Sequence, residues 1–322
     1  MTSARQWSAG ALAVAAFSVS AMAQGWDYGK VEFTTTSIAS NLYMLTGSPD
    51  VDPLHPDAAG GTVGVLAGPD GVLMVDAHYA QLTDKLVAAI KRISPSPIRF
   101  LVNTHVHRDH TSGDANFGKM GVTILAREEL REGLAHPAPL ANGSPAPAVD
   151  PAGLPVVTYG MGGPVRLHMN GEIVTLIPVR AAHTGGDTMI RFEQADAVMV
   201  GDFFRGYGYP YVDPATGGTL KGVLEALDAT IAVANPRTRI IPGHGPITNL
   251  AALRAHRDMI TAVQDKVRQM IAQGRTRQDV LAAKLTVPYD KVVPGGTLQV
   301  GGGTSADRFI DVVYSELKGG GR

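Results

Sequence analysis

The chain has 322 residues, 44% of them hydrophobic and 18% charged, which is enough for one large domain with a substantial core. Lys and Arg total 28 against 29 Asp and Glu, so no basic excess is available to neutralise phosphates, and a charge-driven nucleic-acid binder is excluded. The absence of Cys excludes thiol nucleophiles, iron–sulfur clusters and Cys-ligated zinc, so any metal site must use His and carboxylates.

The first 23 residues have the pattern of a signal peptide. Arg5 precedes an uncharged apolar run that ends in Ala21-Met22-Ala23, the small-x-small pattern of a signal-peptidase site. An uncleaved membrane anchor is the alternative, but the run is shorter than the roughly 20 apolar residues of a spanning helix. We therefore expect residues 24–322 to form a single domain, periplasmic or secreted, with no membrane attachment after cleavage.

The mature chain predicts two similar halves of strands and helices. In the first half we expect strands at 31–37, 41–46, 62–66, 72–75, 98–103 and 122–125, with a helix at 81–93. In the second half we expect strands at 173–179, 188–192, 197–200 and 239–241, and helices around 220–231, 253–270 and 309–317. This pattern favours a layered α/β fold with helices on both outer faces.

Three long segments interrupt these elements. Residues 47–61 are rich in Pro, Asp and Gly, and residues 206–219 are rich in Tyr and Gly. Residues 133–164 contain seven Pro, and we expect an irregular surface loop there. Loops of this length in a compact domain are more often lids or walls of binding sites than plain connectors.

The strongest motif is His105-Val-His107-Arg-Asp109-His110, directly after the expected strand at 98–103. Three His and one Asp at these positions arise by chance on the order of once in a thousand. Residues two apart in an extended segment point the same way, so His105 and His107 can share one metal. As the chain turns into a helix, Asp109 and His110 are directed to a second position beside the first.

Four further residues lie at strand ends, where open α/β sheets place their ligands. They are Asp76, His183, Asp202 and His244. Alone, each is weak evidence, because a single His after a strand is usually a structural residue and Asp202 could be a helix cap. Their occurrence together, in this order, indicates a metal site.

In this order, the residues resemble the five motifs of the metallo-β-lactamase superfamily. The resemblance covers nearly the whole mature chain and implies an αβ/βα four-layer sandwich of two mixed β-sheets with outer helices. It also implies two Zn²⁺ per chain. The implied roles are a first zinc on His105, His107 and His183, a second on Asp109, His110 and His244, a bridge at Asp202 and an orienting carboxylate at Asp76.

The branch of the superfamily decides the expected reaction. A bridging Asp202 resembles the glyoxalase II-like hydrolases and departs from the zinc β-lactamases, while His107 replaces the usual Glu of the di-iron branch and favours zinc. The resemblance thus implies cleavage of an ester, thioester or lactone of a small molecule by a hydroxide that bridges the metals, with Asp109 orienting or deprotonating the water. Hydrolysis of β-lactam antibiotics is the alternative, and a non-hydrolytic redox protein is a further one.

The aromatic and remaining His residues are less specific. Tyr207, Tyr209 and Tyr211 either form a wall of the substrate pocket or pack the loop after Asp202. We expect the other His residues to be structural or on the surface, namely His55, His78, His136, His168 and His256.

Overall fold

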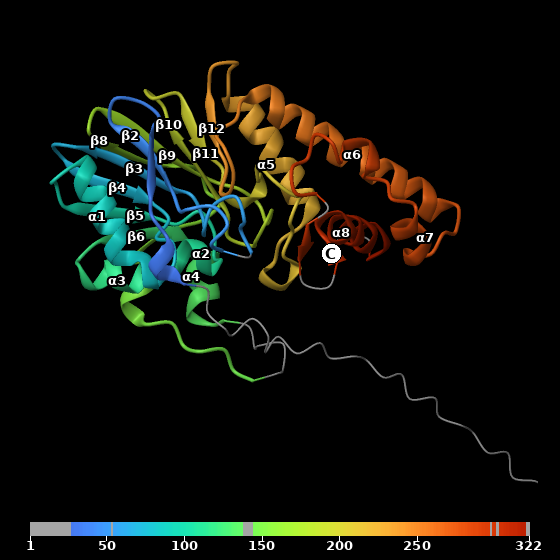
Figure 1. Ribbon diagram of the computed structural model, residues 1–322, viewed down its shortest axis with the longest axis horizontal. Coiled ribbons are helices and arrows are strands. Elements are labelled where there is room, and N and C mark those ends of the chain that lie inside the picture. The colour runs from blue at the N-terminus through green and yellow to red at the C-terminus, as the bar shows by residue number, and fades with distance from the viewer. Residues whose placement is uncertain (1–26, 53, 138–143, 297, 301–302, 320–322) are drawn as a thin grey trace, which may run out of the picture.

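The computed structural model describes residues 27–52, 54–137, 144–296, 298–300 and 303–319 (Figure 1). The predicted signal peptide, residues 1–23, lies outside the described residues. Within the described ranges, no helix is long and apolar enough to cross a membrane.

The first half of the chain forms a seven-stranded mixed sheet, with the strands in chain order from β1 to β7. β1 to β4 are antiparallel neighbours, and each later strand lies parallel to the one before it. The strands are β1 (Thr34–Ser37), β2 (Leu42–Thr46), β3 (Val63–Gly68), β4 (Gly71–Val75), β5 (Ile98–Val102), β6 (Thr123–Arg127) and β7 (Val157–Tyr159). Helices α1 (Thr83–Ile93), α2 (Arg108–Thr111), α3 (Asp114–Lys119) and α4 (Glu128–Ala135) connect the parallel strands.

The second half forms a five-stranded mixed sheet in the order β12-β11-β10-β9-β8. Its strands are β8 (Val165–Met169), β9 (Glu172–Pro178), β10 (Thr188–Phe192), β11 (Ala197–Met199) and β12 (Arg239–Ile241). Helix α5 (Leu220–Val233) carries the chain from β11 to the parallel strand β12. The chain continues through α6 (Leu250–Ala272), α7 (Arg277–Ala282), the short strands β13 (Gln299–Val300) and β14 (Gly303–Thr304), and α8 (Ser305–Gly319).

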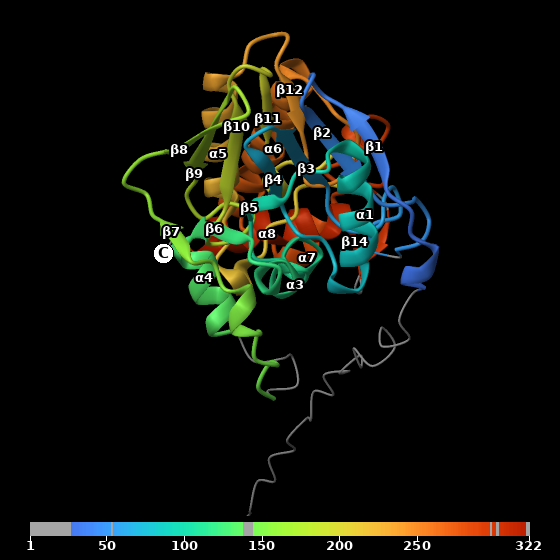
Figure 2. The same cartoon turned by 90° about the vertical axis from the view of Figure 1, so that its left-hand side faces the viewer.

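Alternation along the strands builds four layers. On β4, Met74 packs toward α1, whereas Leu73 packs toward the second sheet, because successive side chains of a strand point to opposite faces. On β10, Ile190 packs toward the first sheet and Met189 toward α5 and the C-terminal helices. The apolar core between the sheets is therefore covered on each side by helices (Figure 2), which confirms the predicted fold class.

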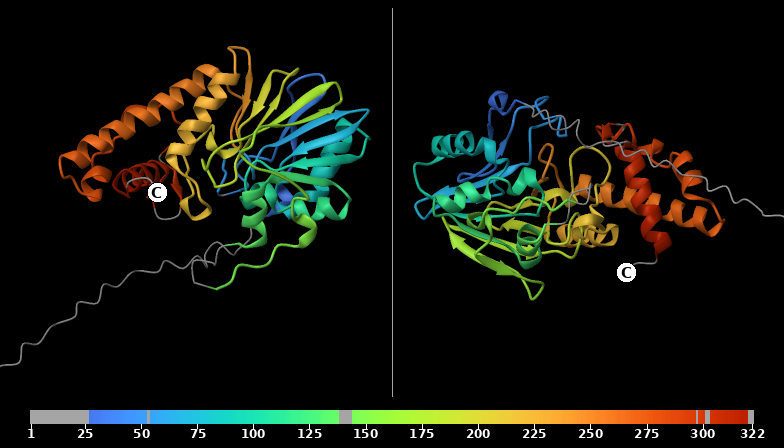
Figure 3. Two further views of the ribbon diagram at one scale, coloured as in Figure 1. Left: turned by 180° about the vertical axis from the view of Figure 1, so that it is seen from behind. Right: turned by 90° about the horizontal axis from the view of Figure 1, so that it is seen from below.

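Helices α6, α7 and α8 pack together and extend to one side of the sandwich (Figure 3). Helix α6 is capped at its N-terminus by Asn249, whose side chain accepts hydrogen bonds from the backbone N–H groups of Ala251 and Ala252. The Tyr209 ring stacks on Phe309 of α8, with ring centres 5.9 Å apart. This contact fixes α8 against the Tyr-rich loop.

The Pro-rich segment at residues 133–164 differs from the prediction of an irregular surface loop. It contains the end of α4, a 3-10 helix at Pro151–Gly153 (η4) and strand β7. Strand β7 pairs in parallel with β6 and forms the edge of the large sheet. The prediction was wrong because it followed the high density of Pro and gave no weight to the run Val156-Val157-Thr158-Tyr159, whose β-branched and aromatic residues favour a strand.

Candidate metal centre

The predicted metal ligands lie on four segments that follow strands at one edge of the sandwich. His105, His107, Asp109 and His110 follow β5, and the other loops follow β9, β11 and β12. These three loops carry His183, Asp202 and His244, respectively. The ends of strands from both sheets therefore meet around one cluster of His and Asp side chains, at the kind of position where α/β folds hold ligands.

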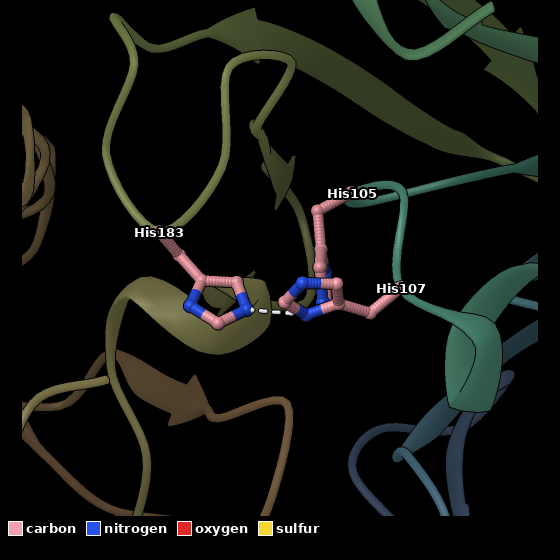
Figure 4. A group of neighbouring side chains, drawn as sticks. All are labelled: His105, His107 and His183. Atoms are coloured by element: carbon pink, nitrogen blue, oxygen red, sulfur yellow. Dashed lines mark hydrogen bonds between the residues drawn. The ribbon is translucent and has the colours of Figure 1, made fainter. Parts of the chain in front are cut away.

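The first group consists of His105, His107 and His183 (Figure 4). One nitrogen of each ring lies within 4.8 Å of the others, and His107 Nδ1 is 2.9 Å from His183 Nε2. His105 is 1% exposed, and its Nε2 atom has no hydrogen-bond partner among the described residues. Three convergent imidazole nitrogens could hold one divalent cation.

Each ring in this group is oriented through the nitrogen that faces away from the others. His107 Nε2 lies 2.9 Å from Asp213 Oδ2, and His183 Nδ1 lies 2.7 Å from the carbonyl oxygen of Tyr211. His105 Nδ1 lies 3.0 Å from Thr104 Oγ1. A nitrogen that donates to such an acceptor leaves the other ring nitrogen as a lone-pair ligand, which is how proteins orient metal-binding His residues.

The second group consists of Asp109, His110 and His244. Asp109 Oδ2 is 3.0 Å from His244 Nε2 and 3.3 Å from His110 Nε2. Asp202 lies between the two groups, because Oδ1 is 3.4 Å from His110 Nε2 and Oδ2 is 3.7 Å from His183 Nε2. A carboxylate in this position could contact a cation in either group.

Asp76 lies beside the second group and orients His110 through a hydrogen bond. It accepts hydrogen bonds from the backbone N–H and the hydroxyl of Thr104, both at 2.7 Å, and from His110 Nδ1 at 2.8 Å. Its backbone has φ of 63°, in the left-handed region that non-glycine residues rarely adopt. Such strain persists only where the surroundings enforce it, and here it directs one carboxylate at two segments of the site.

The electrostatics give His105, His183 and Asp202 the protonation states that a cation requires, whereas neighbouring carboxylates outweigh burial and raise the pKa of His110 and His244. Burial lowers the pKa of His183 to about 3 and places the pKa of His105 well below its usual value, so both rings are neutral at pH 7. Burial alone would raise the pKa of Asp202, but the positive charges of His244 and His110 outweigh it and hold the pKa well below its usual value. Metal ligands must be neutral imidazoles and ionised carboxylates, and the pKa directions of His105, His183 and Asp202 meet this requirement.

The buried atoms of the cluster fit the binding of a metal ion. Among the described residues, His105 Nε2, Asp109 Oδ2 and Asp202 Oδ1 are all buried without a hydrogen-bond partner. Unpaired buried nitrogen and oxygen acceptors are costly unless a positive ligand meets them. Backbone positions also leave room for the ligands, since a Cβ atom at Gly243 would overlap Asp202 Oδ1.

Two residues of the site were missed by the sequence analysis. Asp213, which orients His107, lies 106 positions away along the chain. His55, expected to be structural or on the surface, stacks on His244 with ring centres 4.1 Å apart and approaches Asp109 Oδ2 at 3.5 Å. One signal pointed to His55, namely its place in the long loop at residues 47–61, but nothing in the sequence marked Asp213.

The three tyrosines line a cavity of about 270 Å³ beside the cluster. The Tyr211 ring lies 5.3 Å from the ring of His183, and the Tyr207 ring lies 6.0 Å from that of His244. Tyr209 is 2% exposed, and its hydroxyl bonds to Asp290 at 2.5 Å and to the carbonyl of Thr286 at 3.0 Å. Tyr207 and Tyr211 therefore contact the cluster, whereas Tyr209 mainly packs the loop against the C-terminal helices.

Two mixed sheets between helices, with a His and Asp cluster at the strand ends, define an α/β sandwich with a candidate metal site at its edge. The family model of the metallo-beta-lactamase superfamily matches residues 56–245, and the chain belongs to this superfamily. A search of the sequence against curated proteins found no match.

Solved structures show the same fold at low sequence identity. The metallo-beta-lactamase from Pontibacter korlensis is 18% identical, with a TM-score of 0.57 over 70% of this chain and 99% of that chain. The DIM-1 metallo-beta-lactamase is 17% identical, with a TM-score of 0.54 over 71% of this chain and 97% of that chain. The stereoselective inverting sec-alkylsulfatase Pisa1 from Pseudomonas sp. is 16% identical, with a TM-score of 0.60 over 88% of this chain and 50% of that chain.

Proposed function

We propose that the protein is an exported, dizinc-dependent hydrolase that cleaves the ester, thioester or lactone bond of a small molecule. The observation that carries the proposal is the position of Asp202 between two groups of buried ligands. Membership of the superfamily and a hydrolase fold support the general class. Export rests on the sequence pattern of residues 1–23 alone.

The proposed ligands divide into the two groups described above. His105, His107 and His183 would hold one cation, Asp109, His110 and His244 would hold the other, and Asp202 would contact both. When bound, such a pair of cations lowers the pKa of a water molecule toward neutrality and polarises the bond to be broken. The donor set, imidazole nitrogens and carboxylates without thiolate, suits zinc.

The protein side chains supply the proton transfer and the orientation. Asp109 Oδ2 lies 3.3 Å from His110 Nε2 and 3.0 Å from His244 Nε2, and the charges of these rings outweigh its burial and place its pKa well below the usual value. It is therefore ionised at pH 7 and can accept or orient the proton of an attacking water. Tyr207 and Tyr211 lie between the cluster and the cavity, where a substrate can enter.

A substrate panel tests this proposal. Purified zinc-loaded protein is assayed on matched thioesters, lactones, carboxylate esters and cephalosporins, and we expect turnover of at least one acyl ester class. Asp109→Asn should lower kcat by at least about 100-fold, the usual range for losing a group that moves a proton. Asp228→Asn is the matched control, because Asp228 is exposed and pairs with Arg257 on the surface.

The outcomes separate the alternatives. Exclusive turnover of cephalosporins would replace the proposal with a β-lactamase, a function that the lactamase folds among the similar structures make the next candidate. About two iron ions per chain with no hydrolysis of any substrate would instead indicate a redox protein.

A further inference from the structure

The cavity beside the metal centre carries positive charge. Its wall includes Arg205, from the loop after β11, and Arg308, from helix α8. None of the residues that line the cavity is Asp or Glu. Both arginine side chains therefore line a space of about 270 Å³ whose lining residues include no Asp or Glu.

Arg308 lacks a partner for its charge in the part of the chain that the structure describes. Its Nε atom is buried without a hydrogen-bond acceptor, and its guanidinium lies 5.2 Å from the centre of the Tyr211 ring. Burial and the positive charge of Arg205 both lower the pKa of Arg308. A guanidinium nevertheless remains charged at pH 7, with five N–H donors to satisfy.

Arg205 is only partly neutralised. Its Nη2 atom donates to the Tyr207 hydroxyl at 2.7 Å, and its Nε atom lies 3.8 Å from Asp202 Oδ2, beyond hydrogen-bond distance. Asp202 is also the carboxylate that lies between the two ligand groups. A cation bound there would compete for the charge of Asp202 and leave Arg205 with less compensation.

Arg205 and Arg308 are each partly buried in this wall, and their like charges repel each other unless an anion lies between them. The cavity also continues into the metal centre, because His55, which lines it, stacks on His244. We propose that this cavity binds a carboxylate at the non-reacting end of the substrate through Arg205 and Arg308. This inference rests on the proposed function and narrows it to acyl substrates with an anionic tail, such as half-esters of dicarboxylic acids.

Two esters of equal chain length test the inference. Mono-4-nitrophenyl glutarate carries a terminal carboxylate, and 4-nitrophenyl pentanoate ends in a methyl group. We expect wild-type protein to prefer the glutarate ester by at least tenfold in kcat/KM. Arg308→Gln should reduce this preference at least tenfold, mainly through KM, because one charge-assisted contact is lost. Arg308→Lys keeps the charge and should retain part of the preference.

The control is Arg268→Gln, which removes an exposed arginine that pairs with Asp265 on α6. This variant should keep the full preference. No preference in the wild type, or an equal preference in wild type and Arg308→Gln, would overturn the inference. Arg205 is not replaced, because it also contacts Asp202.

Binding of glutarate separates this inference from the proposed function. Titration calorimetry of the zinc-loaded full chain should show glutarate binding that weakens at least tenfold in Arg308→Gln. If neither ester is hydrolysed but this difference is present, the proposed function fails and the anion site stands. If hydrolysis is present and glutarate binds both proteins equally, the anion site fails and the proposed function stands.

Discussion

Replacement of Asp213 by Asn tests how the chain orients a metal ligand. Asp213 Oδ2 lies 2.9 Å from His107 Nε2, and the carboxylate also accepts hydrogen bonds from Thr216 Oγ1 at 2.9 Å and from Ala215 N at 3.0 Å. Burial would raise the pKa of Asp213, but the bonds from His107 and Thr216 outweigh it and lower the pKa to about 2. The carboxylate is thus ionised at any pH at which the protein is assayed.

The expected magnitude follows from these contacts. An Asn that keeps the bond from Ala215 presents an N–H group to His107, so His107 can no longer donate there and loses its preferred tautomer. Losing such an orienting partner typically costs 10- to 100-fold in metal affinity, or about 1.4 to 2.7 kcal/mol. The helix cap survives, since Asn caps helices as well as Asp does, so the melting temperature of metal-free protein should change little.

The assay is competition for zinc against a chromophoric chelator at pH 7. Asp150→Asn is the matched control, because Asp150 also precedes a Pro-Ala pair and caps a 3-10 helix through Ala152 N, yet is exposed on another segment. We expect weaker binding of one zinc in Asp213→Asn alone. Equal zinc affinity in wild type and Asp213→Asn would refute the orienting role, as would equal losses in both variants.

Three further predictions follow from burial and packing. Gly243→Ala should abolish activity, since its Cβ would overlap Asp202 Oδ1, whereas Gly160→Ala, with open space around it, should remain active when assayed on the same ester. Burial raises the pKa of Asp114 well above its usual value, so the fold loses stability as the pH rises from about 4 to 7. Asp114→Asn should therefore raise the melting temperature at pH 7 by about 2 °C or more, and the increase at pH 4 should be smaller. A higher gain at pH 4 would contradict this. Chelator treatment should lower the melting temperature of wild-type protein, because zinc at 100 times its dissociation constant stabilises the fold by about 2.7 kcal/mol. An unchanged melting curve would show that zinc binding at this site does not stabilise the fold.

The sequence predicted the parts of the site that depend on local patterns. The motif from His105 to His110 spans only the end of strand β5 and the start of helix α2. The two-residue spacing of His105 and His107 is therefore visible in the sequence itself. His183, Asp202 and His244 were predicted because each follows an apolar strand, and strand ends meet at one edge of such a fold. The layered α/β arrangement followed from the order of strands and helices, and the four-layer sandwich was implied by the resemblance to the metallo-β-lactamase superfamily.

The missed features depend on contacts between segments far apart in the chain. Asp213 and His107 are 106 residues apart, and Arg308 reaches Tyr211 from the last described helix. Neither contact leaves a periodic signal in the sequence. Strand β7 was missed because its Pro-rich surroundings outweighed a short run of β-branched residues, although pairing with β6 stabilises it in the fold.

The most direct test of the central claim is the anomalous scattering of zinc in crystals of the full mature chain. The account predicts two anomalous peaks, one contacting His105, His107 and His183 and the other contacting Asp109, His110 and His244, with Asp202 touching both. A single peak, or peaks away from these side chains in protein that hydrolyses an ester, would contradict it.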